Sequence, residues 1–188
     1  RSRAFKVTHG KDNDVVRLIG THVDITHRKK EELFAIRNTN ILEMIAKGVP
    51  AKEIYIEIAL MYEERHPGMF CSMLTLEGTR LIHGGAPSLP KEYCEAINGI
   101  EIGPDIGSCG TATYTGKRVL VEDIKFDSKW ANLKHHALPH GLRSCWSEPV
   151  INASGQVLGA FGMYYQHPGL PNEDETEDLK SAVRLASI

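Results

Sequence analysis

The sequence predicts an α+β fold in which an antiparallel sheet has helices on one face and loops on the other. Strand-like segments come in pairs joined by short turns, which is typical of antiparallel hairpins rather than of parallel crossover units. Segments with helical periodicity precede the first central pair and follow the last pair. These two helices are therefore free to pack together on one face of the sheet, and the loop-covered face is left for a ligand.

Composition limits the classes of partner. The chain has 188 residues, of which 41% are hydrophobic and 24% charged, with a formal net charge of -2, which suits one compact domain plus an extension. The only basic run is His27–Lys30, so we expect neither a nucleic acid nor an anionic membrane as partner. No apolar stretch approaches the roughly 20 residues of a membrane span.

The cysteines indicate the cellular location, and the chain ends indicate that the sequence is part of a longer protein. Cys71, Cys94, Cys109 and Cys145 are scattered without a CxxC pair, which favours a reducing, cytoplasmic location. The chain has no initiating Met, and its last helical pattern still runs at Ile188. We therefore expect a piece of a longer protein.

Two strands and a helix are expected first. Ala4–Thr8 and Val15–Asp24 have strand composition and flank a turn cluster at residues 10–13. Thr26 is a plausible N-cap for a helix that ends at Gly48. Two strands cannot form a stable domain alone.

The rest of the chain alternates strands with helical segments. Pro50 suits the first turn of a second helix, and a helix-bearing loop is expected at residues 87–97. Strands are expected at residues 69–76, 79–83, 100–102, 118–121, 142–151 and 156–165. Asp127 or Ser128 can cap a helix that carries Trp130. Asn172 and Glu175 have capping-box spacing before a closing helix.

The segment GPDIGSCGTATYTG, residues 103–116, places one cysteine in a glycine-rich turn at a helix start. A helix N-terminus favours an anion or a thiolate, so Cys109 is a candidate nucleophile, redox residue or pocket residue. The segment lacks the lysine and spacing of a P-loop, and it is not a dinucleotide fingerprint. A glycine-permitted turn that packs Cys109 is the simpler interpretation.

Two segments carry a family resemblance. IGSCGTATYTGKRVLVEDI, followed by FDSKWANLKHHALPHGLRSCWSEPVINASGQVLGAFGMYY, resembles a GAF domain over residues 39–188. The similarity is greatest to GAF domains of bacterial sensor histidine kinases and of proteins with GGDEF and EAL cyclic-di-GMP domains. RLIGTHVDITHRKKEE resembles the end of a PAS domain and its linker helix. The implied domains are the C-terminal strands of a PAS domain at 1–26, a signalling helix at 27–48 and a GAF domain at 49–188.

This resemblance implies a regulatory sensor module without catalysis, carried in a cytoplasmic signalling protein. It would bind a small molecule or sense redox state, dimerise through its flanking helices and control an output domain, with cyclic-di-GMP turnover first and a histidine kinase next. One alternative is a free methionine-R-sulfoxide reductase, whose members carry a cysteine in a similar turn. Those enzymes need a further cysteine in the helical loop, and residues 123–141 contain none. The other alternative is a dimerisation element with an empty, vestigial pocket.

The pocket candidates come from the turn, the helical loop and the next long strand. In the resembling family the turn borders the ligand cavity, which adds Cys109 and Thr111. Trp130 and Trp146 are large enough to cover a ligand, although core packing is the usual role of such residues. The seven candidates are Cys109, Thr111, Trp130, His136, Ser144, Trp146 and Glu148.

Cofactor signals are weak. Glu148 shares a strand face with Trp146 and Ser144, where its carboxylate would orient a cationic or hydroxylated group, and Cys145 faces the opposite way. His135, His136 and His140 cluster in sequence, so haem stays an alternative, but their spacing alone makes no tetrahedral metal site. The Cys-His pair of bilin-binding GAF domains and the NKFDE signature of cyclic-nucleotide GAF domains are absent from the sequence. No catalytic or metal residue is assigned.

Overall fold

The computed structural model describes residues 2–9 and 15–188, with side chains from residue 23 onward. The chain divides into two compact units, Arg1–Arg37 and Asn38–Ile188. In the first unit, β1 (Ser2–His9) pairs antiparallel with β2 (Val15–His22), which confirms the two predicted strands. The turn expected at 10–13 lies outside the described residues.

The helix α1 (Thr26–Ala46) begins where the sequence predicts, but its first turn is held differently. The Asp24 carboxylate accepts a hydrogen bond from the backbone N–H of Thr26 at 2.8 Å, so Asp24 stabilises the helix start from outside. Within the described ranges, no helix combines the length and apolar character that crossing a bilayer needs.

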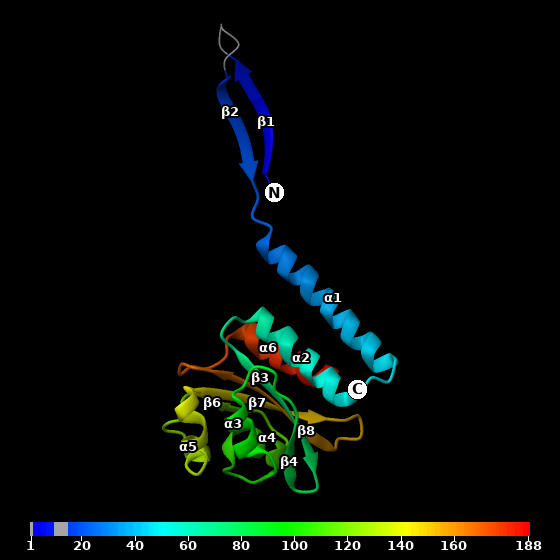
Figure 1. Cartoon of the computed structure of the whole chain (residues 1–188), viewed down its shortest axis with the longest axis vertical. Helices are drawn as coiled ribbons and strands as arrows, with labels where there is room; N and C mark the ends of the chain where they lie inside the picture. Colours follow the sequence, from blue (N-terminus) through cyan, green and yellow to red (C-terminus); the bar gives the residue numbers. More distant parts are fainter. Residues whose placement is uncertain (1, 10–14) are drawn as a thin grey trace. The chain divides into compact units, whose positions relative to one another are not determined.

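The second unit is built on a six-stranded sheet in the order β5-β4-β3-β8-β7-β6. Every pair of neighbouring strands is antiparallel. The strands are β3 (Phe70–Glu77), β4 (Arg80–Gly85), β5 (Ile100–Glu101), β6 (Val119–Val121), β7 (Ser144–Ile151) and β8 (Val157–Tyr165). The two longest hairpins thus meet through β3 and β8 at the centre of the sheet (Figure 1).

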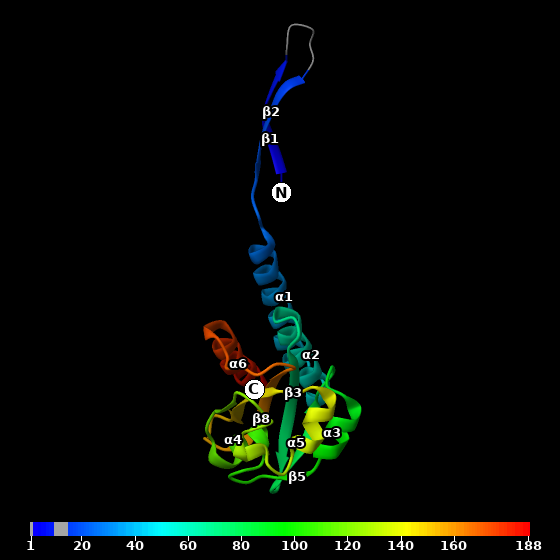
Figure 2. The same ribbon diagram turned by 90° about the vertical axis from the view of Figure 1, so that its left-hand side faces the viewer.

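Helices cover both faces of this sheet. α2 (Ala51–Arg65) and α6 (Glu173–Ala186) touch each other and pack on one face, as the sequence predicts for the helices that flank the sheet. α3 (Lys91–Ile97), α4 (Gly107–Thr115) and α5 (Lys134–Ala137) lie on the other face (Figures 1 and 2). The predicted α+β class is confirmed.

The flanking helices form for local reasons that the sequence shows. In α2, buried Ile54, Ile58 and Met61 recur at helical spacing, which gives the helix one apolar face. In α6, the Asn172 side chain accepts from the Glu175 N–H at 2.8 Å, and the Glu175 carboxylate accepts from the Asn172 N–H at 2.9 Å. The predicted capping box is therefore present.

One predicted helix is divided into short pieces. The segment that carries Trp130 forms η1 (Ser128–Trp130), α5 and η2 (Leu138–His140) instead of a single helix. The Asp127 carboxylate accepts from the Lys129 N–H at 2.8 Å and begins a tight 3₁₀ turn. Gly141 ends the segment in the left-handed region at φ 76°. This broken path lets Trp130 turn inward over α4.

Candidate functional site

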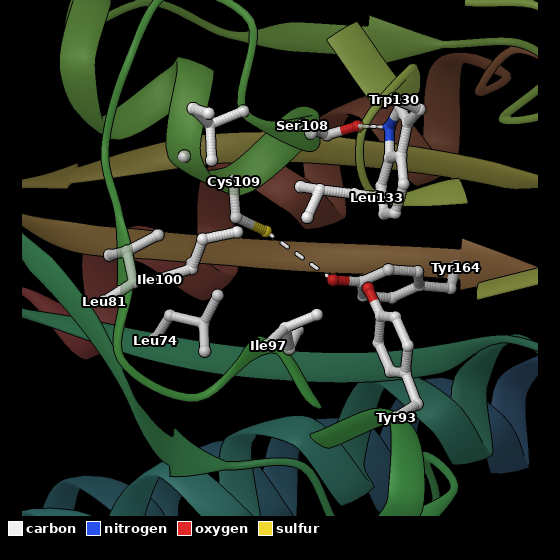
Figure 3. A pocket seen from close by; sticks show the side chains of 13 residues that line it. Leu74, Leu81, Tyr93, Ile97, Ile100, Ser108, Cys109, Trp130, Leu133 and Tyr164 are labelled. Atoms are coloured by element: carbon white, nitrogen blue, oxygen red, sulfur yellow. Dashed lines mark hydrogen bonds between the residues drawn. The ribbon is translucent and has the colours of Figure 1, made fainter. Parts of the chain in front are cut away.

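A narrow, largely apolar cavity lies between α4 and the sheet, and its empty space of about 300 Å³ includes open solvent (Figure 3). Residues from β3, β4, α3, β5, α4, η1 and β8 converge on it. Its lining consists of Leu74, Leu81, Tyr93, Ile97, Ile100, Ile106, Gly107, Ser108, Cys109, Gly110, Trp130, Leu133 and Tyr164. None of these side chains is Asp, Glu, Lys, Arg or His, so a charged ligand would lose its hydration without gaining an oppositely charged partner.

The glycine-rich turn positions α4 above the cavity. Gly107 begins the helix at φ +57°, and a Cβ there would lie 3.3 Å from the Leu133 side chain. The Ser108 hydroxyl donates to the Cys145 carbonyl at 3.0 Å and accepts from the Trp130 indole N–H at 3.1 Å. This chain of hydrogen bonds ties the helix start to β7 on one side and to the cavity wall on the other.

A row of small residues receives the Cys109 thiol. Gly162 on β8 pairs with Ser72 on β3 and with Ser147 on β7, so the three lie side by side across the central strands. A Cβ at Gly162 would lie 2.9 Å from the Cys109 sulfur and 3.1 Å from the Ser72 hydroxyl. Only glycine leaves this space free, which places the thiol directly over the sheet.

The Cys109 thiol is surrounded by hydrogen-bonding groups. Its sulfur lies 3.0 Å from the Ser147 hydroxyl and 3.7 Å from that of Tyr164. The hydrogen bond from the Cys145 thiol lowers the pKa of Cys109 most, burial opposes this, and Ser147 and Tyr164 lower it further, to about 7. Burial and the neighbouring Cys109 raise the pKa of Cys145 well above its ordinary value. Of the two neighbouring thiols, Cys109 therefore ionises first.

Two tyrosines complete the polar side of the cavity. Tyr93 and Tyr164 pack edge to face with ring centroids 5.9 Å apart, and the Tyr164 hydroxyl points toward the Cys109 sulfur with the Tyr93 hydroxyl beside it (Figure 3). Burial raises the pKa of both phenols, so they stay protonated and can donate hydrogen bonds. The Ser72 hydroxyl is fully buried and has no hydrogen-bond partner.

The structure divides the seven sequence candidates. Cys109 and Trp130 line the cavity, and their role toward a ligand stays a prediction. The Thr111 hydroxyl instead supports the turn, because it donates to the Pro104 carbonyl at 3.3 Å and accepts from the Ile106 N–H at 3.1 Å. His136 lies on α5 outside the lining, with its ring centroid 3.9 Å from that of His135 and the two rings tilted by 44°.

Ser144, Trp146 and Glu148 do not line this cavity, because alternate residues of a strand point to opposite faces. Trp146 lies on the α6 side of the sheet, where its ring is 5.3 Å from that of Tyr165 and its N–H donates to the Gly169 carbonyl at 2.9 Å. Glu148 forms an ion pair with Arg118. The opposite facing of Cys145 that the strand pattern predicts is observed.

The sequence reasoning missed Tyr93, Tyr164 and the Ser72–Gly162–Ser147 row. Gly162 lies in GAFGMYY, a strand segment that contains two glycines. Glycine inside a strand indicates a close approach by another element, but it does not say which one. Within the described part of the chain, no group of three or more His, Cys, Asp or Glu side chains is arranged to hold a metal ion.

Comparison with known proteins agrees with this geometry. A family model of the GAF domain matches residues 60–188. The chain belongs to the GAF domain family.

The chain is similar in sequence to a sensor, and in fold to a sensor and to an enzyme. The chain is 38% identical over 171 residues to the methyl sulfide methyltransferase-associated sensor of Methanosarcina acetivorans, covering 90% of this chain and 17% of that protein. A GAF sensor protein from Burkholderia vietnamiensis shares the fold with a TM-score of 0.66 at 16% identity, over 84% of this chain and 93% of its own. The free methionine-R-sulfoxide reductase of Neisseria meningitidis, solved with its substrate, has a TM-score of 0.62 at 16% identity, over 89% and 90%.

Proposed function

We propose that this chain is a sensory GAF module, without catalysis of its own, that binds a small neutral molecule in the cavity beneath α4. The observation that carries the proposal is the apolar cavity, in which the only polar side-chain atoms belong to Ser108, Cys109, Trp130 and two tyrosines. Such an arrangement is typical of ligand pockets, where a few polar groups orient a mainly apolar ligand. The sensor name of the archaeal relative supports the same role.

The cavity chemistry defines the ligand class. The cavity is narrow, and its empty space of about 300 Å³ includes open solvent, so the ligand has to be small. Because the pKa of Cys109 is lowered to about 7, the thiol is partly ionised near neutral pH, which disfavours carboxylates and phosphates. A neutral aromatic or aliphatic molecule with one hydroxyl or carbonyl group fits best.

Two consecutive residues of β8 connect the cavity to the opposite face of the sheet, which α2 and α6 cover. Tyr164 lines the cavity, while the Tyr165 hydroxyl donates to the Glu175 carboxylate at 2.6 Å on the other side of the sheet. Glu175 is also part of the α6 capping box. We propose that a ligand that displaces Tyr164 shifts this strand and thereby changes how α6 begins.

The wider architecture is a proposal as well. The segments at residues 106–124 and 126–165 resemble GAF domains that control cyclic-di-GMP turnover or a histidine kinase. We propose cyclic-di-GMP turnover as the first choice of output and a histidine kinase as the second. Residues 1–26 would be the end of a PAS domain, in a cytoplasmic signalling protein. Exposed Leu33 and Ile36, three residues apart on α1, support dimerisation through the flanking helices.

A reductase of free methionine sulfoxide is the second candidate, favoured by the lowered pKa of Cys109 and by the second thiol beside it. Its substrate carries an ammonium and a carboxylate, and no charged side chain lines the cavity to pair with either. Turnover of free methionine sulfoxide with a thioredoxin system, lost in Cys109→Ala, would establish this alternative in place of the first.

The ligand proposal is tested with a neutral probe and an anionic probe of similar size. Benzyl alcohol and benzoate are titrated into the chain by calorimetry, and we expect binding of the alcohol only. Leu133→Trp fills the cavity and should abolish that binding. Leu138→Trp is the matched control, because Leu138 is half-buried in the same loop but does not line the cavity. Equal binding by both variants, or binding of benzoate alone, would overturn the proposal.

A further inference from the structure

The cavity has a second chemical feature beyond ligand binding, a pair of neighbouring thiols. The Cys109 sulfur lies 3.0 Å from the Ser147 hydroxyl, and the Cys145 sulfur lies 3.8 Å from the same oxygen. Each thiol also shifts the pKa of the other, that of Cys109 down and that of Cys145 up. One cysteine is on α4 and the other on β7, so a bond between them would join the helix covalently to the sheet.

The two thiols differ in access. Cys109 lines the cavity and its sulfur points into it (Figure 3). Cys145 is completely buried and is not part of the lining. A small oxidant that enters the cavity therefore meets Cys109 first, and Cys145 is a neighbouring thiol that can react next.

We propose that Cys109 and Cys145 form a reversible disulfide when hydrogen peroxide or a small alkyl hydroperoxide enters the cavity. The inference deepens the proposed sensory function, on which its signalling meaning rests. The chemical step itself does not require a bound ligand.

The reaction balances in two steps. The Cys109 thiolate attacks one peroxide oxygen, so that an S–O bond forms, the O–O bond breaks and hydroxide leaves to become water. The Cys145 sulfur then attacks the Cys109 sulfur, so that the S–S bond forms, the S–O bond breaks and the second hydroxide takes the Cys145 proton. Two thiols are oxidised, and hydrogen peroxide is reduced to two molecules of water.

The surroundings support this order. Ser147 can donate to the thiolate, and the orphaned Ser72 hydroxyl lies on the other side of Gly162, next to the reacting sulfur. The disulfide would remove the anionic group from the cavity and fix α4 against β7. Oxidation would thus change the same cavity that the ligand occupies.

The experiment treats the reduced chain with hydrogen peroxide and maps its thiols by mass spectrometry after denaturation. We expect the number of free thiols to fall from four to two and the mass to decrease by about 2 Da. A disulfide-linked peptide pair should join Cys109 to Cys145. Dithiothreitol should restore both thiols. Cys94→Ser is the matched control and should form the same disulfide, because Cys94 does not line the cavity.

Two variants test the order of events. Cys145→Ser should stop at a sulfenic acid on Cys109 that dimedone traps, and Cys109→Ser should leave Cys145 unmodified. A disulfide that involves Cys94 or Cys71, or oxidation of Cys94 while Cys109 stays reduced, would overturn the proposal. If a variant does not fold, the disulfide mapping of the chain without substitutions still tests the proposal. Benzyl alcohol binding is measured separately, so failure of the ligand proposal is distinguishable from failure of this one.

Discussion

The two faces of the sheet differ in how their polar groups are arranged, although each contains a buried serine hydroxyl without a hydrogen-bond partner among the described residues, Ser144 on the α6 side and Ser72 on the α4 side. On the α2 and α6 face, the Asp178 carboxylate accepts from Arg65 and lies 2.6 Å from His66, and Tyr165 donates to Glu175. Tyr62 and Phe161 fill the space between with edge-to-face packing. On the α4 face, Ser72 has no partner and the hydrogen-bonding groups converge on one thiol beside a cavity.

This difference separates stability from function. Polar groups that satisfy one another in a packed layer hold the helices in place and leave nothing for a ligand. Buried polar groups that lack some of their hydrogen bonds raise the free energy of the fold. A ligand or a chemical change that pairs these groups lowers it again. We therefore expect the α2 and α6 face to be the structural layer and the α4 face to carry the proposed binding and thiol chemistry.

The largest expected effect on stability is on the face of the sheet that α2 and α6 cover. Trp146→Ala should lower the free energy of unfolding by about 3 to 5 kcal/mol, because it leaves a large cavity in a buried layer. Urea denaturation followed by circular dichroism measures this loss. Trp146→Phe is the control and should lose less, since most of the ring packing remains. A loss below about 1 kcal/mol for Trp146→Ala would contradict the assignment of this face as the packed core.

Gly162→Ala should affect both stability and chemistry. Its methyl group would press on the Cys109 sulfur and the Ser72 hydroxyl, so we expect a loss of about 1 to 3 kcal/mol in the free energy of unfolding. Thiol alkylation at Cys109 should change at the same time. Gly169→Ala is the control, because its Cβ would meet its nearest neighbour at 3.8 Å. Unchanged stability and alkylation in Gly162→Ala would rule out the close approach.

The Cys109 thiol predicts a pH dependence. Its alkylation by iodoacetamide should be half-maximal near its pKa of about 7, far below that of Cys94, whose pKa burial raises to about 11. Because the folded pKa of Cys109 is below its ordinary value, the thiolate stabilises the fold above that ordinary value. This contribution is lost as the pH falls through about 7.

Ser147→Ala tests the cause. It removes a group that lowers the pKa of Cys109, so the alkylation midpoint should move to higher pH. Alkylation rates followed by mass spectrometry across the neutral range measure the midpoint. An unchanged midpoint would mean that the Ser147 hydroxyl does not stabilise the thiolate.

The smallest effect is expected at Glu148. Glu148→Gln breaks the ion pair with Arg118 on a partly exposed part of the sheet, so the free energy of unfolding should fall by less than about 1 kcal/mol. Benzyl alcohol binding and Cys109 alkylation should stay unchanged. Loss of either in Glu148→Gln would indicate that Glu148 contributes to the pocket, as the sequence analysis predicts.

Much of the fold could be predicted because it follows from local patterns. The hairpins, the capping box at Asn172 and the apolar face of α2 each depend on residues close in sequence. The broken loop around Trp130 was harder, because a 3₁₀ turn and a short helix have nearly the same apolar spacing over so few residues. The candidate site was predicted only in part, since Cys109 and Trp130 lie beside the cavity while Trp146 and Glu148 do not.

The sequence by itself determined the α+β class, the alternation of faces along β7 and the glycine-rich turn that begins α4. It also determined that Cys145 points away from Trp146, because that depends only on strand periodicity. Only the tertiary structure decided which face of β7 meets α4, since both faces are apolar enough to be buried. The same packing brings Cys109 over Gly162 and beside Cys145, from segments far apart in the chain. Contacts between such distant segments depend on how helices dock on the sheet, which no local pattern encodes.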